Sequence, residues 1–239
     1  MKYIDSIHDE GANPFAELNK DGALVKQCDA LLAEFERAYD DASIWVLTDY
    51  RWLQRHKIEP EVLNSRMHVM SREAHVSYEL FLYTCIENLL FCMDLVTAYK
   101  YLVQADTDWD YRYFARKIYL LMHESKQMFD NHNEWMHNAE ECLKAKDFDV
   151  QKGIRKKFKA FYKLYDLSDL EFVRHKVETH CDELIPDQIK AVQLMSVKRS
   201  AEIVQAGFDL AVEYAHSLIP MINKMTLAVN AVRVDWPFE

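Results

Sequence analysis

The chain has 239 residues, a formal net charge of -10 at pH 7 and an apolar fraction of 50%. This length and apolar content suffice for one sizeable hydrophobic core, and they exclude a chain that is mostly disordered. The negative charge excludes general coating of nucleic acid or of an anionic membrane surface, although it leaves room for one local basic site.

Turn-forming residues are scarce, with four glycines and five prolines. Sheets and hairpins normally need more of both, so the composition predicts an all-α fold. The five cysteines include no C-x-x-C pair, so neither a zinc ribbon nor a disulfide framework is indicated. The N-terminal segment has no apolar signal core, and we expect a cytoplasmic protein with no cofactor.

Apolar periodicity in the first half predicts a loose segment followed by three helices. We expect the first fifteen or so residues to lack regular structure. The helices are predicted at about 21–40, 43–56 and 66–103, and Pro60 interrupts the pattern between the second and the third.

The central helix contains a stretch that is apolar enough to be mistaken for a membrane span, "LFLYTCIENLLFCMDLVTAYKYLV" at 80–103. Glu87, Asp94 and Lys100 interrupt it, and a bilayer core penalises each such charge by roughly 2.5–3.5 kcal/mol. We therefore expect a helix buried in the centre of a bundle, with no membrane contact.

The second half of the chain continues the helical pattern. Helices are predicted at about 110–130, 134–145, 154–164, 168–185 and 186–229. Ser168 and Glu171 form a capping box that starts the fourth of these, and Pro220 predicts a kink in the last. We interpret 1–239 as a single all-helical domain, in which 1–65 is an N-terminal extension and 66–230 is a helical bundle.

One segment combines histidines with an arginine, "DLSDLEFVRHKVETHCDEL" at 166–184. On a helical wheel, Arg174 and His180 border an apolar stripe on opposite sides, about 120° apart. His175 faces outward among acids. The arginine and the second histidine are therefore placed to converge on a group docked over the stripe.

This arrangement resembles the R-x(4–6)-H motif of the HEPN superfamily. The surrounding "VRHKVETHCDE" is similar to the stretch in several bacterial members, including abortive-infection types, and Asp182 matches an acid that often follows the histidine. The pairs Arg51/His56 and Arg116/His123 have comparable spacing but lack the residue that the family favours after the arginine. Around the motif the resemblance is sharp; over 66–230 it rests only on helical character, and it leaves the N-terminal third unexplained.

The resemblance implies a HEPN-like bundle that forms a homodimer and acts as a metal-independent endoribonuclease of the defence or toxin type, with an antitoxin or other partner protein. His180 would be the general base or acid, Arg174 the phosphate clamp and His175 an orienting residue. The chemistry suits these side chains, because histidine titrates near neutral pH and arginine offers a fixed fork for phosphate oxygens. The alternative is an ordinary amphipathic helix in which Arg174 pairs with Glu178.

A basic segment precedes the motif, "KGIRKKFKAFYKLY" at 152–165. It contains no acid, and aromatic residues interleave with its cations. It would hold an RNA backbone and stack bases, or it is an amphipathic helix with aromatics inward and lysines in water. The residues interpreted as nucleic-acid-binding are Arg155, Lys156, Lys157, Lys159 and Lys163.

Further charged residues are interpreted as supporting the site. Glu87 and Asp94 share one face of the central helix, where we expect them to be buried and to pair with Arg116, Arg174 or a tyrosine hydroxyl. The stretch that contains Arg112, Arg116, His123 and Glu124 reaches the same pocket or contributes packing and salt bridges.

Two other functions stay open from the sequence. One is a non-catalytic helical dimer that binds a protein partner or a nucleotide. The other is a carboxylate–histidine metal protein, because a di-iron bundle uses two E-x-x-H pairs and two further glutamates. The candidate ligands are Glu134 with His137 and Glu213 with His216, joined by Glu87 and Glu178.

Overall fold

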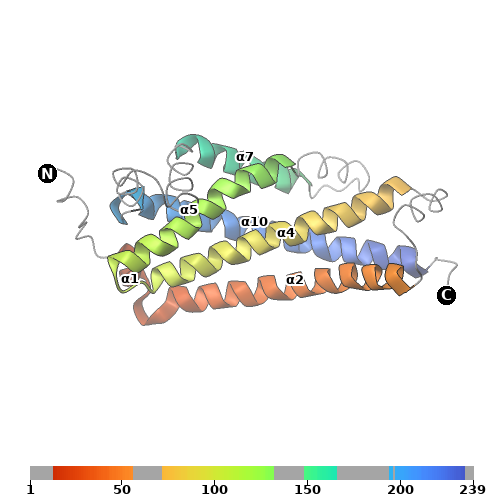
Figure 1. Cartoon of the computed structure of the whole chain (residues 1–239), viewed down its shortest axis with the longest axis horizontal. Coiled ribbons are helices and arrows are strands. Elements are labelled where there is room, and N and C mark those ends of the chain that lie inside the picture. The colour runs from red at the N-terminus through yellow and green to blue at the C-terminus, as the bar shows by residue number, and fades with distance from the viewer. Residues whose placement is uncertain (1–12, 56–71, 132–147, 166–193, 196, 235–239) are drawn as a thin grey trace, which may run out of the picture.

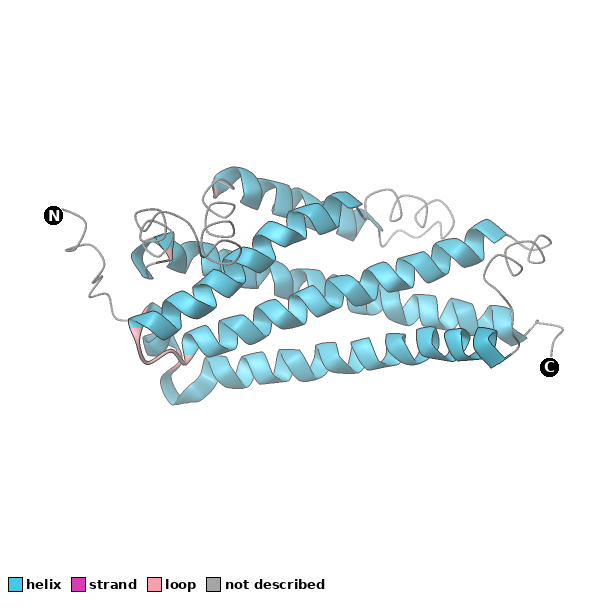
Figure 2. Ribbon diagram, in the orientation of Figure 1, coloured by secondary structure: helices cyan, strands magenta, loops and turns pink. Residues whose placement is uncertain are grey.

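A computed structural model describes residues 13–55, 72–131, 148–165, 194–195 and 197–234. Within these ranges the chain is helical apart from short turns and contains no strand (Figure 2). The all-α prediction is therefore confirmed. The predicted helices at 134–145 and 168–185 lie outside the described residues.

Three long helices form the body of the bundle, and shorter ones cover it (Figure 1). The central helix α4 packs against α2, α10 and α5, while α7 packs on α10. The helix α2 belongs to the segment that we interpreted as an N-terminal extension, and it runs along both α4 and α10. The elements are α1 (Pro14–Leu18), the 3₁₀ turn η1 (Lys20–Gly22), α2 (Ala23–Arg55), α4 (Arg72–Val103), α5 (Asp108–Asn131), α7 (Phe148–Leu164) and α10 (Val197–Val234).

The helix α4 supplies much of the core because three helices surround it. Leu89, Leu95, Val96 and Leu102 are all fully buried. The prediction that the apolar stretch belongs to a buried bundle helix is thus confirmed. Among the helices of the described ranges, none combines the length and the apolarity needed to cross a membrane.

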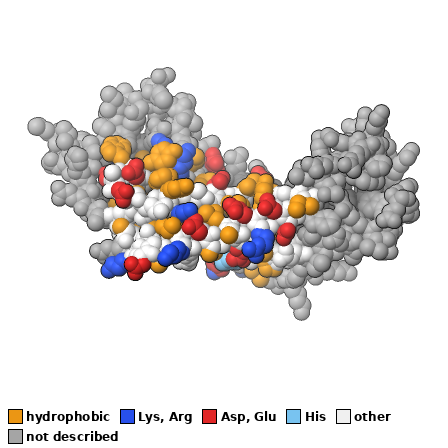
Figure 3. Space-filling model, turned by 90° about the horizontal axis from the view of Figure 1, so that it is seen from below, with side chains coloured by type: hydrophobic (Ala, Val, Ile, Leu, Met, Phe, Trp, Pro, Cys, Tyr) orange, Lys and Arg blue, Asp and Glu red, His pale blue; other side chains and the backbone are white. Residues whose placement is uncertain are grey.

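The helix α2 is continuous, so the predicted break between 40 and 43 is wrong. Its apolar stripe carries on through that point: Phe35, Ala38 and Ala42 are buried at successive turns, while Asp40 and Asp41 are exposed. The two acids lie on the solvent-facing side of α2, and the apolar periodicity of the helix continues past them. On the underside of the molecule, where α2 lies, acidic and basic side chains are mixed (Figure 3).

The chain is ordered earlier than expected, because α1 begins at Pro14. Asn13 caps this helix by accepting a hydrogen bond from the Phe15 amide at 3.1 Å, and proline is favoured in the first turn that follows. The Asn13 Nδ2 also donates to the carbonyl of Leu102 at 3.0 Å and to that of Ala105 at 3.4 Å. The expectation of a loose start is therefore wrong for 13–15.

Most of the remaining boundaries differ from prediction by at most a turn or two, but the predicted last helix at 186–229 is interrupted, because Met195 lies in a turn and α10 begins at Val197. The helix α5 matches to within two residues, and Thr107 caps its start: the Thr107 hydroxyl accepts from the Asp110 amide at 3.1 Å and donates to the Asp110 carboxylate at 2.7 Å. The helix α7 begins before the predicted 154 and passes through Gly153, whose low helix propensity suggested a later start. The helix α10 passes Pro220 and ends at Val234; a kink there stays a prediction.

Candidate functional site: a basic face on α7

The arginine–histidine motif lies outside the described residues. This applies to Arg174, His175, His180 and Asp182, and also to the first E-x-x-H pair, Glu134 and His137. Their assigned roles stay predictions. The described residues do include the basic segment before the motif, the second E-x-x-H pair and the supporting charges.

The helix α7 presents a row of lysines to solvent. Lys152, Lys156, Lys159 and Lys163 are all exposed and fall within an arc of about 60° on the helical wheel. We call these four residues the lysine face. It is opposite the buried side of the helix, because Ile154, Phe158 and Phe161 form that side, and it therefore concentrates positive charge away from the bundle.

The aromatic residues of α7 point into the bundle. Phe158 is 1% exposed and packs edge-on against Tyr214 at 5.8 Å between ring centroids. The Tyr162 hydroxyl hydrogen-bonds to Ser125 at 2.5 Å, and the Tyr165 hydroxyl donates to Glu202 at 3.1 Å. The interpretation with aromatics inward and lysines in water is confirmed for this helix, so Phe158 and Phe161 are not available to stack on bases.

Two of the cations interpreted as nucleic-acid-binding lie off the lysine face. The Lys157 ammonium is 2.5 Å from the Glu213 carboxylate and ties α7 to α10. Arg155 is partly buried, and its charge lies near enough to Tyr214 to oppose the strong rise that burial causes in the pKa of that hydroxyl. Lys156, Lys159 and Lys163 are the three predicted residues that the fold brings together on one surface.

Both residues of the second E-x-x-H pair lie on α10, but they contact different neighbouring helices. Glu213 contacts Lys157 of α7, whereas His216 Nε2 lies 3.6 Å from the Glu34 carboxylate of α2 and its ring packs edge-on against Phe35. Within the described ranges, no three histidine, cysteine, aspartate or glutamate side chains gather closely enough to hold a metal ion.

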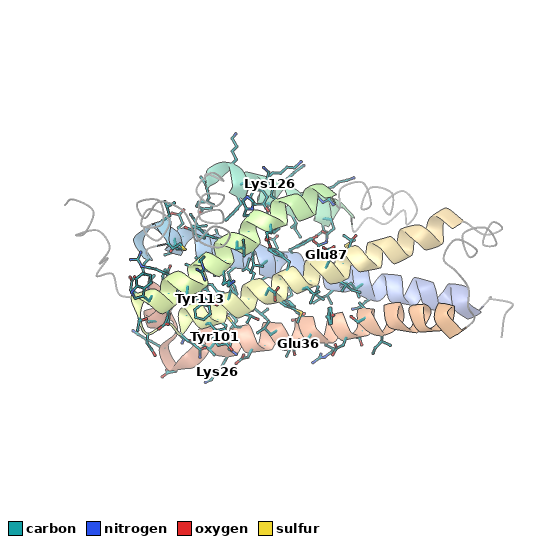
Figure 4. All side chains as sticks on the ribbon, viewed as in Figure 1. Lys26, Glu36, Glu87, Tyr101, Tyr113 and Lys126 are labelled. Carbon is teal, nitrogen blue, oxygen red and sulfur yellow. The ribbon has the colours of Figure 1, made fainter. Side chains whose placement is uncertain are left out.

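The acids of the central helix are exposed, so the expectation that Glu87 and Asp94 are buried is wrong. They lie with Leu90 and Tyr101 on the strip of α4 that faces solvent, and Figure 4 labels Glu87 and Tyr101 on this helix. Partial desolvation nevertheless raises the pKa of Asp94. These exposed positions were not predicted, because the stretch is apolar overall and only one residue per turn faces solvent.

The arginines of α5 have different surroundings. Arg112 is 2% exposed, and its Nε donates to the Asp108 carboxylate at 2.6 Å, as expected of a salt-bridge residue. The Arg116 guanidinium instead lies over the ring of Tyr113, with 5.0 Å between its central carbon and the ring centroid. Glu124 is exposed. Sequence reasoning passed over Trp109 and Tyr113, although their spacing of four residues puts both on one side of the helix.

The buried thiols carry no chemistry at neutral pH. Burial raises the pKa of Cys28 to about 11, and it raises the pKa of Cys85 and Cys92 further. A thiol needs its thiolate form to act as a nucleophile or metal ligand. These three residues therefore serve as small core side chains.

Comparison with known proteins assigns no family to the chain. No family model, no curated protein and no solved structure matches it.

Proposed function

We propose that this chain binds RNA through the lysine face of α7 and cleaves it without a metal ion through Arg174 and His180. The observation that carries the proposal is the concentration of exposed cations on α7 in a chain whose net charge is -10. A phosphate backbone is a ligand that such a row of lysines suits, because neutralising phosphates releases condensed counterions.

The lysine face acts on the backbone alone. Its lysines project from the side of α7 opposite the buried aromatics, so it offers charge and no ring to a base. Contacts of this kind position a nucleic acid without reading its sequence. The proposed binding is therefore sequence-independent and strongly dependent on salt.

The proposed catalytic pair follows the lysine face closely along the chain. Arg174 comes ten positions after Leu164, the last residue of α7, and an extended chain of that length spans at most about 36 Å. His180 would take the proton of a 2′-hydroxyl or supply one to the leaving oxygen, and Arg174 would stabilise the phosphate charge. In this proposal His175 orients the pair, a second copy of the chain completes the site, and a partner protein restrains it.

The test is cleavage of end-labelled single-stranded RNA by the purified protein with EDTA present. We expect cleavage by the wild type and loss of cleavage in His180→Ala, with binding of the same RNA retained. The matched control is His216→Ala, a histidine on α10 outside the proposed site, which should cleave like the wild type. Equal cleavage by wild type and His180→Ala, or cleavage only when metal is added, would refute the catalytic assignment.

A further inference from the structure

A second surface outside the lysine face combines aromatic rings with a cation. Trp109, Tyr113 and Arg116 lie within an arc of about 60° on α5, on the side opposite the buried residues Tyr111, Ile118 and Met122. Trp109 is 65% exposed and Tyr113 is 48% exposed. Single exposed apolar side chains are normal, but two large rings beside one another form a small exposed patch, which is more informative.

Arg116 supplies the cation of this surface, and its side chain is partly buried. Its Nε is shielded from solvent and has no hydrogen-bond partner, and its central carbon is 5.0 Å from the Tyr113 ring centroid. Among the ion pairs of the described residues, none involves this guanidinium, whereas Asp108 is already bonded to Arg112. A partly buried guanidinium is suited to an oxyanion that accepts two hydrogen bonds.

Tyr113 and Trp109 have different roles on this surface. The ring of Tyr113 already has Arg116 on it, so this residue holds the guanidinium in place. Trp109 is the more exposed of the two rings. It lies two helical turns before Arg116, about 10.5 Å along the axis, and offers a flat surface for another planar group.

We propose that this face of α5 binds a nucleoside phosphate, with the base stacked on Trp109 and the phosphate on Arg116. A nucleotide carries a ring and an oxyanion at opposite ends, which is the pairing that the two side chains require. The nearby carboxylates do not compete for Arg116: Asp108 bonds to Arg112, and Asp110 belongs to the helix cap with Thr107. The site is independent of the lysine face, and it takes a free nucleotide or one unit of a single-stranded RNA.

The probes are AMP, measured by calorimetry, and a twelve-residue oligo(A), measured by fluorescence anisotropy. We expect Trp109→Ala to weaken binding by about 5- to 150-fold, the range for loss of one base stack. Arg116→Gln should weaken it by about 10- to 150-fold, the range for a hydrogen bond to a charged group. Loss with both probes indicates a free-nucleotide site; loss with oligo(A) alone indicates a subsite for RNA.

Matched controls are available on other elements. Leu18→Ala removes an apolar side chain that is 63% exposed, and Lys26→Gln removes one exposed positive charge on α2. Both should bind as the wild type does. The inference is overturned if the wild type binds neither probe, or if Trp109→Ala and Arg116→Gln bind both probes as tightly as these controls. AMP is too small to contact the lysine face as well. Its binding therefore tests the α5 site alone, whether or not the proposed RNA cleavage is found.

Discussion

Removing charge from the lysine face should make RNA binding less sensitive to salt by a calculable amount. The triple variant Lys156→Gln, Lys159→Gln, Lys163→Gln leaves α7 otherwise intact, because all three side chains are exposed and exposed substitutions usually change stability by less than about 0.5 kcal/mol. Each phosphate contact on a single strand contributes a slope of about -0.7 to the plot of log affinity against log salt. Three contacts contribute about -2.1.

That difference is large enough to measure. Between 50 and 200 mM salt, a slope of about -2.1 corresponds to an affinity loss of about 18-fold. The wild type should therefore lose about 18-fold more affinity than the triple variant over this range, as measured by anisotropy of a labelled single-stranded RNA. The control is Lys20→Gln, Lys26→Gln, Arg37→Gln, which removes the same charge from exposed positions on η1 and α2.

Comparing the two triple variants separates the effect of where the charges lie from the effect of the total charge. Both triple variants lower the net charge from -10 by three, so any general electrostatic effect is common to them. If the two variants show the same slope, the lysine face holds no phosphates and the proposed binding mode is refuted. If the wild type shows no salt dependence, RNA does not bind as proposed at all.

Two glycines and one cysteine give further predictions. Gly153→Ala should raise the free energy of unfolding by about 0.5–1 kcal/mol, since no atom lies within 4 Å of the added carbon; Gly207→Leu should lower it by about 1–3 kcal/mol, since that carbon already meets Met122 at 3.3 Å. Thermal unfolding measures both, and an unchanged Tm for Gly207→Leu would contradict the close approach of α10 to α5. Burial raises the pKa of the Cys28 thiol from an ordinary value of 9.0 to about 11 in the folded chain. In the unfolded chain the thiol has its ordinary pKa and therefore loses its proton at a lower pH. Stability should therefore fall as pH rises from about 9 to 11, and urea unfolding should show a shallower fall in Cys28→Ala; parallel curves would refute this.

The fold could be read from the sequence where the apolar period was long and regular. Cys28, Leu31 and Phe35 recur at helical spacing within the predicted helix at 21–40 and are buried, and the bounds of α5 differ from prediction by two residues at most. Failures came where local residue preferences opposed tertiary packing. Gly153 suggested a late start for α7, but the burial of Gln151 and Ile154 keeps that turn helical.

The candidate site was predictable only in part. Charge density alone indicated the basic helix, and the period of α7 then put Lys156, Lys159 and Lys163 on its outer side. Trp109 could not be found this way, because it stands in a polar stretch just before the predicted start of the helix at 110. The contact between Arg116 and Tyr113 depends on side-chain orientation, which spacing alone leaves open.

The hydrogen bonds from Asn13 to Leu102 and Ala105 close a loop of roughly ninety residues. The Leu102 carbonyl already accepts from the Ala105 amide within the turn that follows α4, at 3.1 Å, so Asn13 adds a long-range donor to a local one. Contacts between such distant parts of a chain form late and slow folding. During synthesis, Asn13 would leave the ribosome long before Leu102 and Ala105, so these two hydrogen bonds would form only after α4 has been made.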